Sequence, residues 1–87
     1  MRILVFHLNE GGRLPALTPE LGQAVKAGIQ QAVRDNPSIT YYGTQFDPTT
    51  GIGVCDWEAP STEEVEAIFQ RLGVPYDKVV AVQPLVL

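Results

Sequence analysis

Apolar positions along this chain follow two periods, one typical of strands and one of helices. The short apolar run from Ile3 to Leu8 ends at the turn-forming residues Asn9 to Gly12 and has the length of a central strand. Residues 39–46 and 52–58 are rich in β-branched and aromatic types, and the segment between them, Asp47 to Gly51, is a turn by composition. These segments predict a first strand followed later by a β-hairpin.

Two other stretches carry helical periodicity with start and stop signals. The first is expected to begin at Thr18-Pro19-Glu20 and to end at Asn36-Pro37. Its apolar or small positions form one stripe: Leu21, Ala24, Val25, Gly28, Ile29, Ala32 and Val33. Ser61 to Glu64 reads as a capping box that opens a second helix, and Gly73 suits its left-handed C-cap. Residues 79–82 predict a last strand.

Two glycines inside these elements predict close packing. Gly28 weakens its helix but would let the helix approach the sheet closely. Gly53 suggests a β-bulge or a close backbone approach in the third strand.

The order β-α-β-β-α-β predicts an α+β, ferredoxin-like fold in a single domain spanning residues 1–87. Its four-stranded antiparallel sheet has the order 4-1-3-2, with both helices on one face. The strands carry apolar side chains on both parities, so the open face is not expected to lie bare in water. We therefore expect a homodimer in which two open faces pack together around a barrel-like cavity. The apolar tail from Pro84 to Leu87 could cross to the partner.

The composition of the chain argues against nucleic acids and membranes as partners. The chain has 87 residues, a hydrophobic fraction of 45% and a net charge of −4, and its six Lys and Arg residues are scattered, so nucleic-acid binding is not expected. No apolar run has the length of a membrane span, so no membrane partner is expected either. Cys55 is the only cysteine, which excludes an internal disulfide and fits a reducing compartment; the expected location is the cytoplasm.

The acidic residues of the third strand suggest which side chains face outward. Burying an unpaired carboxylate is costly, so Asp56 and Glu58 are expected on the open face, together with Ile52 and Val54. A five-residue turn would pair Phe46 with Ile52 and Tyr42 with Asp56.

His7, the only histidine, joins this face if Ile3 and Val5 also point to the open side. His7, Tyr42 and Asp56 are then the predicted ligand-binding residues, and His7, Asp56 and Glu58 the predicted ligands of a divalent transition metal. The alternative is a half-buried histidine at a strand end beside a solvated strand.

Other candidates have structural explanations. Cys55 has the opposite parity, toward the helices, and with Gly43 opposite it is expected to be a buried thiol instead of a nucleophile. Trp57 shares that parity and is expected in the core. Gly11-Gly12-Arg13 lies between a strand and a helix but lacks the spacing of known phosphate loops, so phosphate binding is not expected.

The second half of the chain resembles a known family. The matching residues run from Asp47-Pro48 through Gly51, Cys55, Glu58-Ala59-Pro60-Ser61, Gly73 and Pro75 to Asp77. They are similar to those of a small ferredoxin-like family of poorly defined function that includes a nickel-binding protein. The resemblance covers residues 39–82 well and the first half by layout. It implies the paired-sheet dimer and nickel binding through histidines, of which His7 lies on a matching strand. Further ligands would come from carboxylates or from the partner copy.

Three functions remain open. The first is a small homodimeric binding protein that holds a metal ion, with nickel as a candidate, or a small ligand between two sheets. The second is a cofactor-independent dimeric α/β-barrel enzyme of the monooxygenase or isomerase type, with His7 as base and with Tyr42 and Asp56 orienting the substrate. The third is a structural or regulatory dimerisation module.

Overall fold

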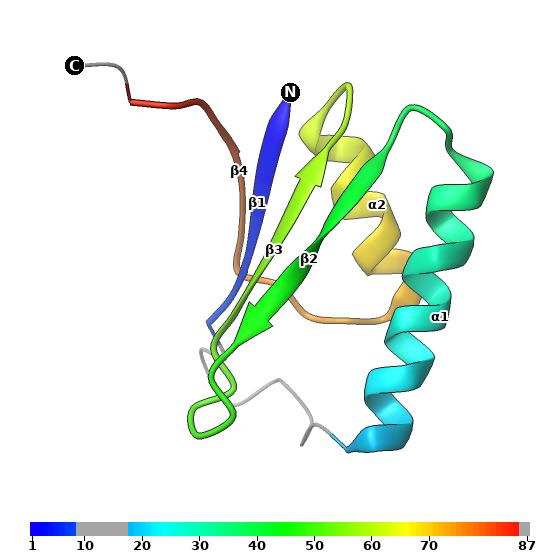
Figure 1. Cartoon of the computed structure of the whole chain (residues 1–87), viewed down its shortest axis with the longest axis vertical. Helices are drawn as coiled ribbons and strands as arrows, with labels where there is room; N and C mark the ends of the chain where they lie inside the picture. Colours follow the sequence, from blue (N-terminus) through cyan, green and yellow to red (C-terminus); the bar gives the residue numbers. More distant parts are fainter. Residues whose placement is uncertain (9–17, 86–87) are drawn as a thin grey trace.

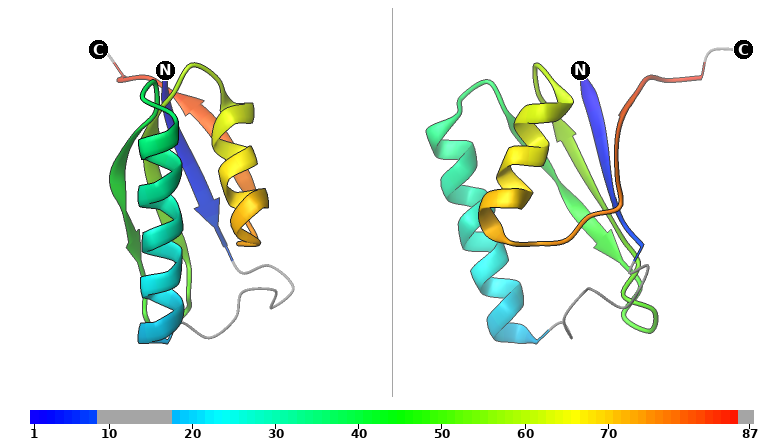
Figure 2. Two further views of the ribbon diagram at one scale, coloured as in Figure 1. Left: turned by 90° about the vertical axis from the view of Figure 1, so that its right-hand side faces the viewer. Right: turned by 180° about the vertical axis from the view of Figure 1, so that it is seen from behind.

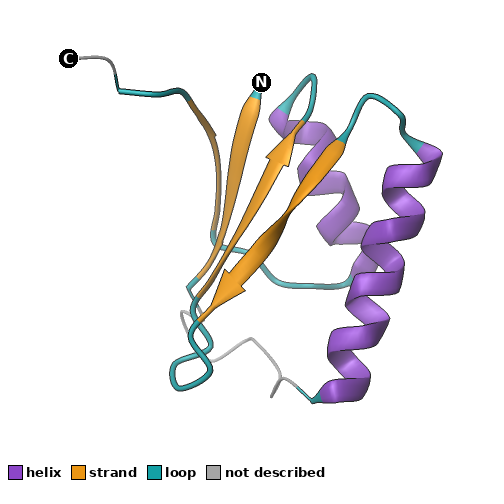
Figure 3. Ribbon diagram, in the orientation of Figure 1, coloured by secondary structure: helices purple, strands orange, loops and turns teal. Residues whose placement is uncertain are grey.

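The described residues, 1–8 and 18–85 of the computed structural model, form a four-stranded antiparallel sheet with two helices on one face (Figure 1, Figure 3). Along the chain the elements are β1 (Arg2–His7), α1 (Pro19–Asp35), β2 (Thr40–Phe46), β3 (Gly53–Glu58), α2 (Thr62–Leu72) and β4 (Lys78–Val82). The strand order is β2-β3-β1-β4, and both views in Figure 2 place the helices on the same side of the sheet. The predicted ferredoxin-like α+β fold is confirmed.

Helix α1 begins where the sequence predicts because Thr18 caps it. The Thr18 hydroxyl accepts a hydrogen bond from the backbone N–H of Leu21 at 3.1 Å, and Pro19 lies in the first turn, where no N–H donor is needed. The helix buries Ile29 and Ala32 on its inner side. No helix of the described segments is long and apolar enough to cross a membrane.

Helix α2 shows both predicted boundary signals. The Ser61 side chain accepts a hydrogen bond from the backbone N–H of Glu64 at 3.3 Å, and acidic residues occupy the first turn. Gly73 ends the helix with φ 71°, a left-handed conformation that a glycine adopts without steric cost. Between these ends the helix buries Val65, Ile68 and Phe69.

Gly28 allows a close approach, but to a different partner than predicted. A Cβ atom at this position would lie 2.3 Å from Cδ2 of Leu72 on α2. The glycine therefore lets the two helices approach each other, whereas the sequence predicted an approach of α1 to the sheet. The predicted close packing at Gly28 is present, but its neighbour is α2 and not the sheet. Helical periodicity alone does not say which element the apolar stripe of α1 contacts.

The core lies between the helices and the sheet and takes the odd-numbered residues of β1 and β3. Ile3 pairs with Trp57 and Val5 pairs with Cys55 across the antiparallel ladder, so these side chains share the inner face. All four are buried, and Phe69 of α2 packs edge-on against Trp57 at 5.7 Å between ring centroids. The core placement of Cys55 and Trp57 is as predicted.

The β2–β3 hairpin forms, with a different register from the predicted one. Phe46 pairs with Gly53, and Asp56 pairs with Gly43 instead of Tyr42. The register shifts between Tyr41 and Gly43, where β2 carries an extra residue and Gly43 adopts φ 131°. The bulge therefore lies in β2 and not at Gly53, for which a bulge was one of two predicted explanations; the other, a neighbouring backbone, is present, since a Cβ atom at Gly53 would lie 3.5 Å from the carbonyl oxygen of Gln45. β3 also begins at Gly53, which leaves Ile52 exposed in the turn.

The end of the chain runs away from the helices after β4 (Figure 2). Leu85 is 84% exposed and does not belong to the core. The predicted crossing of the tail to a partner also involves residues 86–87, which lie outside the described residues, as does the Gly11-Gly12-Arg13 segment.

Candidate functional site

The open face of the sheet carries the even-numbered residues of β1 and β3. Leu4 pairs with Asp56 on one side and with Val80 on the other, and Phe6 pairs with Val54. Apolar side chains thus occupy the middle of a face on which no helix lies (Figure 1). The predicted outward orientation of Asp56, Glu58 and Val54 agrees with this register.

Arg2, Asp56 and Tyr42 form a polar cluster on this open face. Nε and Nη2 of Arg2 donate to the two carboxylate oxygens of Asp56 at 2.6 and 2.8 Å, a bidentate ion pair. The guanidinium carbon lies 4.1 Å from the centroid of the Tyr42 ring. The hydrogen bonds from Arg2 lower the pKa of the Asp56 carboxyl. Sequence reasoning placed Tyr42 and Asp56 together correctly but missed Arg2.

Replacing Arg2 by glutamine is expected to return the pKa of Asp56 toward the ordinary value of an aspartate. The ion pair contributes stability that is present above the unfolded-state pKa and lost as the pH falls through the lowered pKa. A carboxyl-carbon NMR titration measures the shift, and Arg71→Gln at the end of α2 is the matched control. An Asp56 pKa that is equal in Arg2→Gln and wild type would contradict the pairing.

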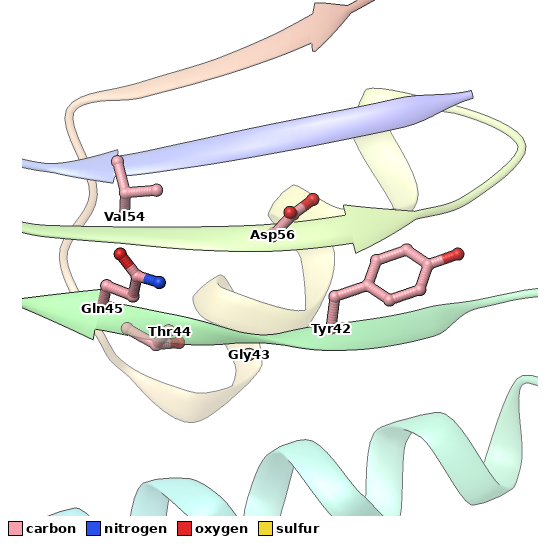
Figure 4. Close-up of a pocket in the computed structure, with 6 residues that line it drawn as sticks. All are labelled: Tyr42, Gly43, Thr44, Gln45, Val54 and Asp56. Atoms are coloured by element: carbon pink, nitrogen blue, oxygen red, sulfur yellow. The ribbon is translucent and has the colours of Figure 1, made fainter.

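A shallow hollow of about 310 Å³ lies beside this cluster on the open face (Figure 4). It is lined by Tyr42, Gly43, Thr44, Gln45, Val54 and Asp56. Figure 4 shows Asp56 and Tyr42 projecting from adjacent strands on the side away from the helices. The hollow can present a carboxylate, a phenol and an amide to a small polar ligand.

His7 does not lie on this face, which corrects the predicted cluster. It shares the inner face with Ile3 and Val5 and is 7% exposed. The reason is the ladder register: directly paired residues share a face, Val5 pairs with Cys55, and Cys55 points inward because Asp56 points outward. The sheet therefore separates His7 from Tyr42, Asp56 and Glu58.

Neither the predicted ligand-binding residues nor the predicted metal ligands come together within one chain. The described residues contain no group of three or more His, Cys, Asp or Glu side chains arranged to hold a metal ion. Glu58, the third predicted metal ligand, lies with its Oε2 atom 3.1 Å from the backbone nitrogen of Met1 at the far end of its strand.

On the inner face His7 meets partners that the sequence does not place beside it. Its Nδ1 lies 2.7 Å from the carbonyl oxygen of Pro75, so Nδ1 carries the proton and donates to that oxygen. Nε2, the other ring nitrogen, lies 3.4 Å from Sγ of Cys55. The imidazole also packs edge-on against Phe69, with 5.1 Å between ring centroids.

Cys55 is a buried thiol, as expected, but it has a base and a hydroxyl beside it. Burial raises the pKa of the Cys55 thiol to about 11. Thr44 Oγ1 lies 3.0 Å from Sγ and hydrogen-bonds in turn to the hydroxyl of Tyr41. The bulge in β2 creates this contact, because it brings Thr44 rather than the predicted Gly43 opposite Cys55.

A cavity of about 700 Å³ opens between the helices and the inner face of the sheet. His7, Tyr41, Thr44 and Cys55 supply polar groups to a wall that is otherwise mostly apolar, with α1 and the end of α2 on the other side. No local pattern in the sequence signals this arrangement, since His7 and Cys55 are 48 residues apart. Only the β1–β3 register brings them together.

Comparison with known proteins gives one family. Residues 4–82 match the family described as nickel responsive protein SCO4226-like. The crystal structure of SCO4226 from Streptomyces coelicolor A3(2) is similar over 100% of both chains, with a TM-score of 0.71 and 26% sequence identity. A search of curated proteins gave no match. Because the match spans nearly the whole sequence, this chain belongs to the nickel responsive protein SCO4226-like family.

Proposed function

We propose that this chain acts as a small homodimeric binding protein that holds a transition-metal ion, with nickel as the first candidate. The observation that supports a dimer is the uncovered, partly apolar open face of the sheet. Tyr42 is 51% and Val80 39% exposed there, and Leu4 and Phe6 lie between them on the central strand. Sheets with apolar side chains on an uncovered face gain stability by packing against a second sheet.

The description of the family supports the proposed binding of a metal ion. Its description links it to a response to nickel, and ion binding is the simplest chemistry for such a response. The described residues of one chain offer donors in two places: the carboxylates of Asp56 and Glu58 on the open face, and the His7–Cys55 pair inside. In the paired dimer, Tyr42 and Asp56 would line the cavity between the sheets and could also hold a small polar ligand. The chain would act as one domain in the cytoplasm.

The enzyme alternative has lost its main support. It required His7 as a base on the open face, and the structure places this histidine behind the sheet. The third alternative, a dimerisation module without a ligand, shares the dimer with our proposal and differs only in binding nothing.

Two measurements on the wild-type protein test the proposal. Light scattering is expected to give the mass of two chains of 9.5 kDa each, and calorimetric titration with Ni²⁺, Co²⁺ and Zn²⁺ is expected to give saturable binding. A monomer at all concentrations contradicts the sheet pairing. A dimer that binds none of the three ions supports the dimerisation module instead.

A further inference from the structure

We infer that each chain binds a flat, neutral aromatic molecule with a hydroxyl group, in the part of the helix–sheet cavity that lies over Gly53, between His7 and Phe46. This part of the cavity is called the Gly53 slot below. It lies on the face of the sheet opposite the proposed dimer interface, so such binding depends neither on the dimer nor on a metal ion.

Three residues in one row across the sheet form the Gly53 slot. His7 of β1 and Phe46 of β2 both pair with Gly53 of β3, and directly paired residues point to the same face. Because Gly53 has no side chain, the row carries a ring at each end and a gap in the middle. A Cβ atom at Gly53 would have three nearest neighbours within 4 Å, and all three belong to β2. None of these neighbours comes from a helix.

The width of this gap suits an aromatic ring. Neighbouring strands lie about 4.8 Å apart, so the backbones of β1 and β2, on either side of β3, are separated by roughly 9.5 Å. Packed aromatic rings have centroids about 4.5–7 Å apart. A third ring therefore fits between the imidazole of His7 and the phenyl ring of Phe46 and contacts both at ordinary distances.

The walls around the slot leave apolar surface uncovered. Phe46 is 49% exposed, although its pairing with Gly53 places it on the helix side of the sheet. Helix α1 buries Ile29 and Ala32, both in its second half, whereas Leu21 near its start is half-buried and lines the cavity. The volume of about 700 Å³ falls within the range of about 300–1,000 Å³ that is typical of pockets for small organic molecules. Covering such apolar surface favours an apolar ligand.

The polar groups beside the slot suit an uncharged hydroxyl group. Nδ1 of His7 donates to the carbonyl oxygen of Pro75, so the neutral imidazole presents its acceptor at Nε2. Thr44 contributes a hydroxyl group 3.0 Å from Sγ of Cys55, and burial raises the pKa of this thiol to about 11, so that it keeps its proton. A ligand hydroxyl can donate to the imidazole and accept from the threonine.

Charged side chains line the cavity only where it is exposed. Lys26 and Asp47 are the charged residues among the described lining residues, and both are exposed. The carboxylate of Asp47 is moreover engaged by the backbone N–H of Thr49 and the hydroxyl of Thr50. A charged group of the ligand would lose its hydration in the slot without gaining a counter-charge, which is costly. The ligand is therefore expected to be neutral.

The test is a calorimetric titration of the full-length protein with 2-naphthol, naphthalene and 2-naphthoate, three flat molecules that differ in one polar group. Wild type is expected to bind one 2-naphthol per chain. Naphthalene is expected to bind about 3–10-fold more weakly, because it lacks the hydroxyl and its hydrogen bonds. The carboxylate of 2-naphthoate is expected to weaken binding by at least about tenfold.

Two variants and a matched control locate the binding in the slot. Gly53→Val fills the gap with a good strand former, at a position where a Cβ atom meets Phe46 Cβ at an ordinary 3.4 Å, and is expected to weaken 2-naphthol binding by at least about tenfold. Phe46→Ala removes one wall and is expected to weaken it about fivefold or more. Ile52→Ala is the control: Ile52 is 44% exposed in the same hairpin but does not line the cavity, so binding should not change.

Four results would contradict this binding site. Wild type that does not bind 2-naphthol, or that binds 2-naphthoate as tightly, would overturn the inference, and so would undiminished binding by Gly53→Val. Equal affinities for naphthalene and 2-naphthol would overturn the role of the hydroxyl group. None of these results bears on the proposed function, which light scattering and the metal titrations test separately.

Discussion

Replacing Trp57 by alanine is expected to lower the free energy of unfolding by about 3–5 kcal/mol. Trp57 is 0% exposed and is the largest fully buried side chain. Its ring packs against Tyr41 at 4.7 Å and against Phe69 at 5.7 Å between centroids, so its removal leaves a cavity in the middle of the core. A chain of this size has a total stability of roughly 4–13 kcal/mol, so the substitution would remove a large share of it.

Urea denaturation measures this effect, and Trp57→Phe is the matched control. The indole Nε1 of Trp57 is buried without a hydrogen-bond partner among the described residues. Phenylalanine keeps an aromatic ring and removes that unsatisfied donor, so part of the lost packing is offset. We expect Trp57→Phe to cost less than half as much as Trp57→Ala. An alanine variant as stable as wild type would show that the core does not depend on this ring.

Replacing Val80 by aspartate is expected to convert the proposed dimer into a monomer. Val80 lies beside Leu4 on the open face, with its side chain 39% exposed, so the charge should leave the fold of a single chain intact. In a symmetric dimer each copy contributes one new carboxylate to the apolar interface. Like charges brought together there cost several kcal/mol, which corresponds to a rise in the dissociation constant of about 100-fold or more.

Light scattering over a concentration series measures this change. Gln30→Asp is the control, because it places the same charge on an exposed position of α1, away from the open face. The control is expected to remain dimeric. A Val80→Asp protein with the same dimer affinity as wild type would exclude the open face as the interface.

Local signals predicted the elements of the fold, because their causes lie within a few residues of one another. Thr18 and Ser61 cap helices through backbone donors three residues ahead, and Gly73 ends α2 by its own backbone conformation. A strand with apolar residues at both odd and even positions, however, does not reveal by its sequence which of its faces is buried. β1 is apolar on both parities, so the face of His7 could be decided only by the pairing of Val5 with Cys55.

The candidate site was predicted less well for the same reason. Asp56 and Tyr42 lie on the open face as expected, since an isolated carboxylate is costly to bury. The contacts of Cys55 depend on a bulge in β2 and on a strand paired from the far end of the sequence. Gly43, in the middle of its strand, was a sign of that bulge, whereas within the hairpin a bulge or a close backbone approach was predicted only at Gly53.

The place of β1 in the sheet has a consequence for synthesis on the ribosome. β1 is a central strand, yet its neighbours β3 and β4 both come much later in the chain. While the polypeptide is being made, its first apolar segment has no native strand to pair with until β3 is available, and its second edge stays open until β4 follows α2. Pairing between such distant segments closes a long loop and slows folding. The first apolar segment of the chain therefore stays without its native strand partners until nearly the whole sequence is available, and the sheet can close only as one late event.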